Sequence, residues 1–244
     1  MNMRKVTRIL IIVLCMGFTF STAYTLYAMV GTDYDSKYKD MLAELDVHDK
    51  FKREIDKLVG KGYDLSDLMV AYEFLYQSYG RMQELEALVK QQDSGKSWEH
   101  VFKDYNKSHK PFVPRAFDTD YLESLMKTNG LTSDDIMIAD RIGFVSAKAF
   151  KDILIAKLET QNSWKEIAAE HNIVNSSSTL PRVPVTQEEL SKFTSASKLT
   201  EERVTEAIVL AKKIGKTPQQ VISSMKSGQS EEAILADGYV EKYR

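Results

Sequence analysis

Apolar residues along this chain recur at steps of three and four, which is the spacing of one face of an α-helix. In the segment that begins at Gly62, one such stripe consists of Leu68, Ala71, Tyr72, Leu75 and Tyr79. Val70 and Phe74 lie about 200° from this stripe on a helical wheel, so the helix has a second apolar side. The pattern predicts a helix packed between neighbours. No strand-like alternation of useful length occurs, and the sequence therefore predicts an all-α fold.

The same pattern occurs three times, with an offset of about 68 residues. The matching segments are GYDLSDLMVAYEFL from Gly62, GLTSDDIMIADRIG from Gly130 and KLTEERVTEAIVLA from Lys198. An apolar pair precedes each segment and an apolar cluster follows it, so each copy is predicted to contain four short helices. One alanine recurs in every copy and suits a close helix crossing. These alanines are Ala71, Ala139 and Ala207.

Two of the copies also share an eleven-residue phrase, KSWEHVFKDYN at 96–106 and NSWKEIAAEHN at 162–172. Ser97 and Ser163 are predicted to be N-caps, and Glu166 is predicted to complete a capping box with Ser163. Trp98 and Trp164 then fall in the first turn, where a large ring can cover the seam between helices. The phrase thus predicts the start of one more helix in each copy.

Asn106 and Asn172 close the phrase, and asparagine tolerates the left-handed conformation that ends a helix. The proline-containing stretches that follow end in Pro114-Arg115 and Pro181-Arg182, and they predict extended connectors. The predicted organisation is an N-terminal helical cap at 31–46 and helical repeats at 47–115, 116–182 and 183–244, the last a truncated, polar cap. Such repeats form a short solenoid or a compact helical array.

The first thirty residues differ from the rest. Arg4, Lys5 and Arg8 precede the apolar run 9–20, and no acidic residue occurs before Asp33, a pattern typical of an export signal. Small residues at 21–23 permit cleavage, whereas continuation of the apolar stretch to Val30 permits retention as a membrane anchor. Both outcomes stay open. The sequence predicts a protein that is secreted or anchored on the outer face of the cytoplasmic membrane.

Composition limits the chemistry of the exported part. Cys15 is the only cysteine, so the remainder has no disulfide, thiolate metal site or cysteine nucleophile. Without the three N-terminal cations, 30 basic residues face 35 acidic ones, and this balance disfavours nucleic acid as a partner. Membrane contact is expected only through 9–30. No phosphate-binding loop, nucleophile elbow or metal-ligand motif occurs, and no catalytic residue, metal or cofactor is predicted.

The candidate binding residues fall into two sets. The first copy is rich in aromatic residues, which suggests either a binding groove or a larger core; Phe74, Tyr76 and Tyr105 are the candidates. Arg115 and Arg182, at the ends of two copies, could clamp an anionic ligand. The alternative is that each arginine pairs with helix carbonyls or with a neighbouring acid.

The recurring order is a glycine, an Asp-Leu or Asp-Ile, an alanine three residues on, a second helix and then Ser-Trp. Over 62–106, 130–172 and 198–234 it resembles repeats in secreted or membrane-tethered proteins of Gram-positive bacteria. The resemblance implies location and architecture, and no activity follows from it.

These observations favour a non-enzymatic, extracytoplasmic helical-repeat protein that binds another envelope or surface protein, because helical repeats usually create binding surface. A cell-envelope hydrolase that uses an acidic pair in a cleft between repeats is one alternative, and it requires a buried carboxylate with a raised pKa. A tethered ligand or ion sensor is another. Whether the chain is an enzyme stays open at this point.

Overall fold

The structure is a computed structural model in which residues 35–244 are described. Residues 41–244 form one compact unit. The predicted export or anchor segment, 1–30, lies outside the described residues. Of the predicted cap at 31–46, residues 35–44 are helical. No helix in the described part of the chain is long and apolar enough to cross a membrane.

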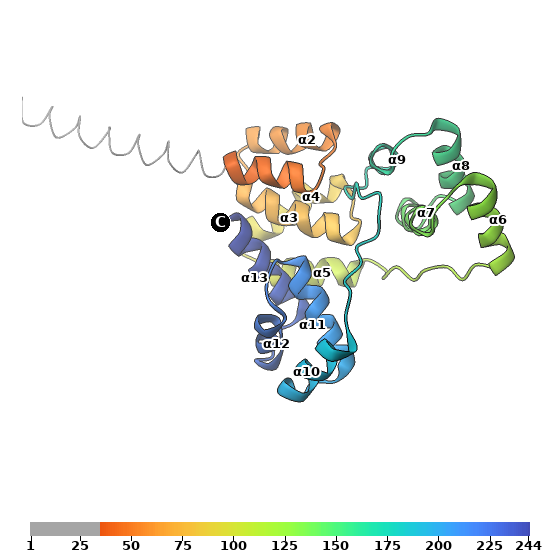
Figure 1. Cartoon of the computed structure of the whole chain (residues 1–244). Coiled ribbons are helices and arrows are strands. Elements are labelled where there is room, and N and C mark those ends of the chain that lie inside the picture. The colour runs from red at the N-terminus through yellow and green to blue at the C-terminus, as the bar shows by residue number, and fades with distance from the viewer. Residues whose placement is uncertain (1–34) are drawn as a thin grey trace, which may run out of the picture. The chain divides into compact units, whose positions relative to one another are not determined.

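The regular elements of residues 35–244 are all helical, which confirms the predicted all-α class. The first group contains α2 (Asp49–Gly60), α3 (Leu65–Ser78), the 3-10 turn η1 (Met82–Glu84), α4 (Leu85–Asp93) and α5 (Trp98–Ser108). The second contains α6 (Thr119–Asn129), α7 (Ser133–Ser146), α8 (Phe150–Thr160) and α9 (Trp164–Glu170). The third contains α10 (Gln187–Ser197), α11 (Glu201–Lys213), α12 (Pro218–Lys226) and α13 (Glu231–Tyr243). Irregular connectors at 109–118 and 171–186 join the groups (Figure 1).

The shared phrase begins helices as the sequence predicted, but it does not end both of them. The hydroxyl oxygens of Ser97 and Ser163 accept hydrogen bonds from the backbone N–H of the third helical residue in α5 and α9, and each cap contributes about 1 kcal/mol. Asn172 has φ 59°, the predicted left-handed conformation. Asn106, however, lies inside α5, which continues to Ser108, and its side-chain amide donates to Glu232 Oε1 at 3.0 Å.

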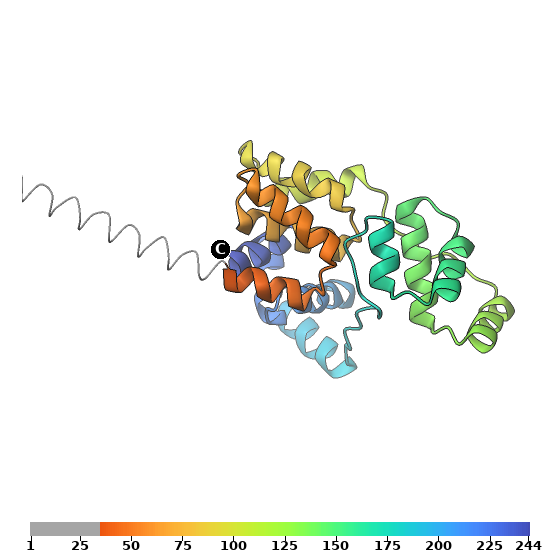
Figure 2. The same ribbon diagram turned by 90° about the horizontal axis from the view of Figure 1, so that it is seen from above.

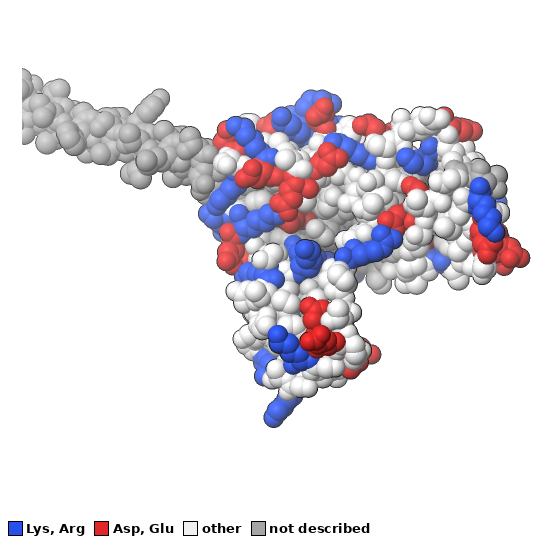
Figure 3. Space-filling model, in the orientation of Figure 1, with Lys and Arg blue, Asp and Glu red and all other residues white. Residues whose placement is uncertain are grey.

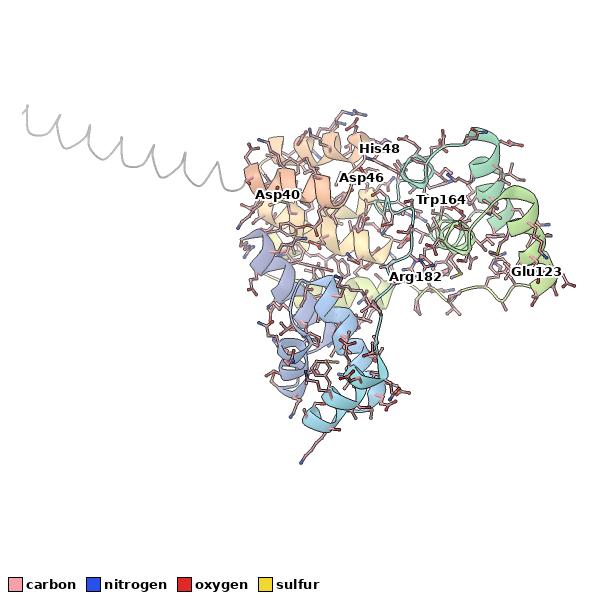
Figure 4. All side chains as sticks on the ribbon, viewed as in Figure 1. Asp40, Asp46, His48, Glu123, Trp164 and Arg182 are labelled. Atoms are coloured by element: carbon pink, nitrogen blue, oxygen red, sulfur yellow. The ribbon has the colours of Figure 1, made fainter. Side chains whose placement is uncertain are left out.

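The predicted capping box of α9 is not formed, because Glu166 has a partner in the first group. Its carboxylate lies 2.9 Å from Nε2 of His48. Beside it, Lys165 Nζ donates to Asp46 Oδ1 at 2.7 Å. Figure 4 shows Asp46 and His48 on the side of the first group nearest Trp164, so the start of α9 is attached there.

The central helix of each group is the one on which the apolar pattern was found. In α3 every residue from Ser66 to Leu75 is buried, and Ala71, Ala139 and Ala207 have no exposed surface. Trp98 and Trp164 are also buried, 5% and 2% exposed. The indole Nε1 of Trp164 donates to Asp135 Oδ1 at 2.6 Å, which ties α9 to the start of α7.

The last helix returns to the first group. Helix α13 packs against both α3 and α5, and Figures 1 and 2 show it beside them. The third copy, 183–244, was predicted to be a truncated, polar cap. Within it, α13 buries Tyr239 and Tyr243 almost completely, so this helix belongs to a core. Gly238 permits its approach to α11, since a Cβ at that position would lie 2.7 Å from Cβ of Ile214. The first and third groups therefore share one core.

A buried carboxylate lies in this contact. Glu73 of α3 is 2% exposed, and its Oε2 accepts a hydrogen bond of 2.5 Å from the Tyr243 hydroxyl. Lys242 Nζ lies 3.1 Å from the same carboxylate and 3.0 Å from that of Glu44, and Arg244 pairs with Asp67. Burial raises the pKa of Glu73, while the bonds from Tyr243 and Lys242 oppose the change. Charge pairing thus fixes the C-terminal residues on α3.

The two connector arginines also pair with buried acids. Arg182 donates from Nη1 and Nη2 to the carboxylate of Asp134, at 3.1 and 2.5 Å. Arg115 donates from its backbone N–H and from Nε to Asp140, at 2.9 and 3.1 Å. The side chains of Asp134 and Asp140 are 10% and 4% exposed. Both ends of the second group are therefore fastened to α7.

Glu73→Gln tests the buried charge. A carboxyl group whose pKa is higher in the folded than in the unfolded chain binds more protons when folded, so its contribution to stability falls as pH rises above the unfolded value of 4.5. Glutamine does not titrate and can still accept the bond from Tyr243. We expect the free energy of unfolding of the natural chain, minus that of the variant, to decrease between pH 4.5 and 7 in urea titrations. A pH-independent difference would contradict this assignment.

Arg182→Ala tests the connector pair. The change leaves the carboxylate of Asp134 buried without its cation, while the arginine it removes is 68% exposed. We expect a loss of about 1–2 kcal/mol in the free energy of unfolding, between the values for surface and buried pairs. Arg203→Ala is the matched control, since Arg203 and Glu206 are both about half exposed; its expected loss is about 0.5 kcal/mol or less. Equal losses in the two variants would show that burial of Asp134 does not matter.

Candidate binding site

Phe74 is a core residue and presents no surface to a ligand. It is 2% exposed, and its ring stacks on that of Phe102 with centroids 3.9 Å apart and an interplanar angle of 3°. The edge of Tyr105 completes the cluster at 5.2 Å. Of the two interpretations of the aromatic first copy, the larger core is correct for Phe74, because α5 and α13 cover that side of α3.

Tyr76 holds a connector. Its hydroxyl lies 2.8 Å from Oγ of Ser177, and its backbone carbonyl accepts a hydrogen bond of 2.9 Å from the Asn175 amide. The adjacent Ile173 and Val174 are 0% and 1% exposed. Tyr76 therefore belongs to the seam in which residues 173–176 are buried against the first group.

Arg115 and Arg182, the predicted anion clamp, are occupied by Asp140 and Asp134. Both arginines arise at the ends of groups, as expected, but they neutralise acids of α7. The contacts match the alternative interpretation, in which each arginine pairs with a neighbouring acid, because α7 buries two carboxylates that need cations.

Tyr105 does line a cavity. A hollow of about 330 Å³ lies where α3, α5 and α7 end, and it is walled by Ser78, Tyr79, Arg81, Glu84, Tyr105, His109, Lys110, Phe112, Arg141, Phe144 and Val145. These residues come from the first group, the connector at 109–118 and the second group. We call this hollow the junction cavity. It is the place where the chain brings aromatic, cationic and apolar side chains together.

Glu84 is the acid of the junction cavity, and protein donors surround it. The Tyr105 hydroxyl donates to Oε2 at 2.9 Å, the backbone N–H of Arg81 donates to the same oxygen at 2.7 Å, and His109 Nε2 lies 2.9 Å from Oε1. Burial, with the negative charge of Glu84, raises the pKa of Tyr105. Tyr105 therefore acts as a hydrogen-bond donor that fixes Glu84.

Arg141 of α7 has a different environment. Its guanidinium carbon lies 4.8 Å from the ring centroid of Tyr79 and 4.6 Å from that of Phe112. Arg141 donates one long hydrogen bond, of 3.4 Å, from Nη2 to the backbone carbonyl of Ser78. Among the described residues no carboxylate forms an ion pair with it, and its buried Nε has no partner. Burial lowers the pKa of Arg141.

Tyr79 closes α3 in the left-handed conformation, with φ 57°, and this places its ring at the cavity. The side chain is 8% exposed, and its hydroxyl has no hydrogen-bond partner within the described part of the chain. Burial raises the pKa of Tyr79 to about 12. A buried polar group without a partner costs about 1–3 kcal/mol. Tyr79 and Arg141 thus leave two unused donors at one site.

Sequence reasoning did not identify Tyr79, Arg141, Phe112 or Phe144. One signal was present: Arg141 interrupts the apolar pattern of α7 at the position that Glu73 occupies in the first copy. Phe144 was assigned to no face, yet it is 44% exposed at the cavity. The junction depends on which helix ends meet, and this is not encoded in local spacing.

Two other hollows are less suited to bind a polar or charged ligand. One of about 250 Å³ lies beside α2 and α4, where Lys50, Lys57 and Lys61 already bond to Asn172, Glu54 and Glu86. The other, of about 270 Å³, lies between α10 and α12 and is mainly apolar. The described residues contain no cluster of three or more potential metal ligands. On the face shown in Figure 3, acidic and basic side chains are interspersed.

No protein-family model matches the chain, and no curated protein or solved structure is detectably similar to it.

Proposed function

We propose that this chain is a non-enzymatic helical-repeat protein that binds another protein through the junction cavity and the apolar surface beside it. The observation that carries the proposal is the cavity itself: unpaired donors from Tyr79 and Arg141 lie next to the exposed ring of Phe144. Binding sites for small groups combine an apolar lining with a few polar contacts in this way.

The repeat interpretation is part of the proposal. Each of the three groups has four α-helices, and in each the second helix contains the alanine without exposed surface. Ser-Trp begins the fourth helix in two groups, and Ser230-Glu231 begins it in the third. Repeated units of this kind stack to form surfaces at their boundaries, and the junction cavity lies at such a boundary.

Location outside the cytoplasm, by secretion or by a retained anchor, is also proposed. It rests on the basic and apolar pattern of residues 1–30 and on the resemblance to tethered Gram-positive repeat proteins. The partner expected on these grounds is a protein of the cell envelope or surface.

Binding is favoured over hydrolysis by the arrangement of the acids. Glu73 is a buried carboxylate with a raised pKa, as an envelope hydrolase would need. It lies in the packed contact between α3 and α13, where Lys242 and Tyr243 occupy it. At the junction cavity the lining includes one carboxylate, Glu84, whereas glycoside hydrolysis requires two.

The full chain, tagged and cross-linked in an envelope fraction, tests the proposal. We expect the natural chain to retain a protein in stoichiometric amount, and Phe144→Asp to lose it, since a charge on the exposed ring position disrupts an apolar contact. Ile155→Asp on α8 is the matched control, because Ile155 is 49% exposed and Phe144 is 44% exposed. A partner that is lost equally from both variants, or a chain that retains none, would refute the proposed function.

A further inference from the structure

Resting on that proposed function, we infer that the junction cavity receives a carboxylate with an apolar group next to it, and that Arg141 is its ion-pair partner. The terminal carboxylate of a protein chain and a free small carboxylic acid share this chemistry.

The first step is the missing counter-charge. The cavity lining contains three cations and one carboxylate. The cations are Arg81, Lys110 and Arg141, and the carboxylate is that of Glu84. Glu84 is bound by Tyr105, His109 and the backbone of Arg81, and not by Arg141. Arg141 is partly buried and its Nε is fully buried. A guanidinium withdrawn from water without an anion is costly, so the site favours a ligand that supplies one.

Internal comparison supports this step. Glu73 and Arg141 occupy the same position of the sandwiched helix in the first and second copies. In the first copy α13 brings Lys242 and Tyr243 to the charge. In the second, the described residues provide Arg141 with a carbonyl and two aromatic rings, but no acid. A ligand carboxylate at Arg141 would be the counterpart of Lys242 at Glu73.

The donors suit a carboxylate. Guanidinium groups bind carboxylates through paired N–H groups, and such charge-assisted bonds are stronger than neutral ones. Arg141 Nε and the Tyr79 hydroxyl are both buried and unpaired. Phe112, which lies on Arg141 from the irregular connector, is partly exposed, and both residues line the cavity.

Helix ends argue against a doubly charged anion. Helices α3, α5 and α7 all end at the cavity, and the C-terminus of a helix carries a partial negative charge. The carbonyls of Ser78 and Val145 already accept bonds from Arg141 and Arg81. Three cationic side chains and one carboxylate give the lining a net charge of +2, and the partial charges of the three helix ends, about −0.5 each, reduce it to a value that suits a monoanion better than a phosphate dianion.

The apolar part of the ligand has a defined place. The rings of Phe112 and Phe144 meet edge to face with centroids 5.5 Å apart, and Val145 lies beside them. A volume of about 330 Å³ is at the lower end of the range for small-ligand sites. The cavity thus fits one residue-sized group rather than an extended chain.

Calorimetric titration of the full chain with N-acetylphenylalanine and with N-acetylphenylalaninamide tests the inference. The two probes differ only in the charged group. We expect the acid to bind at least tenfold more tightly than the amide, and Arg141→Gln to abolish this preference. Tyr79→Phe, which keeps the ring and removes the unpaired hydroxyl, is expected to weaken the acid roughly fivefold, the value of one hydrogen bond. Arg203→Gln, at an exposed pair on α11, is the matched control and should bind as the natural chain does.

Equal affinity for acid and amide, failure of both to bind, or a preference that survives Arg141→Gln would overturn the inference. Displacement of the acid by an equal concentration of inorganic phosphate would overturn the assignment of a monocarboxylate. Thermal unfolding checks each variant, and Tyr79→Phe decides the matter if Arg141→Gln does not fold. Loss of the envelope partner from Phe144→Asp is measured in a separate experiment. If the acid shows no preference over the amide but the partner is still lost from Phe144→Asp, the carboxylate inference fails and the proposed function stands.

A third titration identifies the source. The probes are a peptide that ends in phenylalanine with a free carboxylate and the same peptide amidated at that end. Binding of the free peptide at least as tightly as N-acetylphenylalanine supports a protein chain end. Binding of the small acid with exclusion of the peptide supports a free carboxylic acid at this site and contradicts the binding of a protein chain end there.

Discussion

The contact of α13 with α3 and α5 is the constraint on which the arrangement of residues 41–244 depends. It places a carboxylate, Glu73, inside a core, where an unpaired charge would be strongly destabilising. Lys242 forms an ion pair with Glu73, and the Tyr243 hydroxyl donates a hydrogen bond to it, both from the last turn of α13. Because the partners lie 169 and 170 positions apart, the first and third groups are held together by residues that no local segment contains.

The second group is attached in another way. Its helices pack mainly with one another, and its two ends are fastened to α7 by Arg115 and Arg182. Residues 173–176 then lie buried along the first group, where Gly80 accepts a backbone hydrogen bond of 3.0 Å from Val174. Gly80 has no room for a side chain, since a Cβ would lie 2.4 Å from Cδ2 of Leu75. The connectors therefore position the end of α7 against the ends of α3 and α5.

This placement creates the junction cavity and its imbalance of charge. Within residues 35–244, each buried acid of α3 and α7 is paired with a cation, whereas Arg141 has no acid. Three helix ends and an irregular connector leave the guanidinium between two aromatic rings with a donor unused. The site that follows is suited to hold a small anionic and apolar group. It offers one carboxylate, and that carboxylate is already bound.

The sequence by itself determined the all-α class, the starts of α5 and α9 at Ser97 and Ser163, and the buried alanine columns. Caps and apolar periodicity are local properties, so they can be recognised without a partner. Tertiary structure decided the rest. Glu166 contacts His48 and does not form the predicted capping box, and Asn106 lies within α5 and does not end it. The arginines expected to clamp an anion pair with Asp134 and Asp140. Arg141, an interruption in the apolar pattern of its own helix, became a candidate site only because three helix ends meet around it. Long-range charge pairing sets those outcomes, and its partners are chosen by packing rather than by spacing in the sequence.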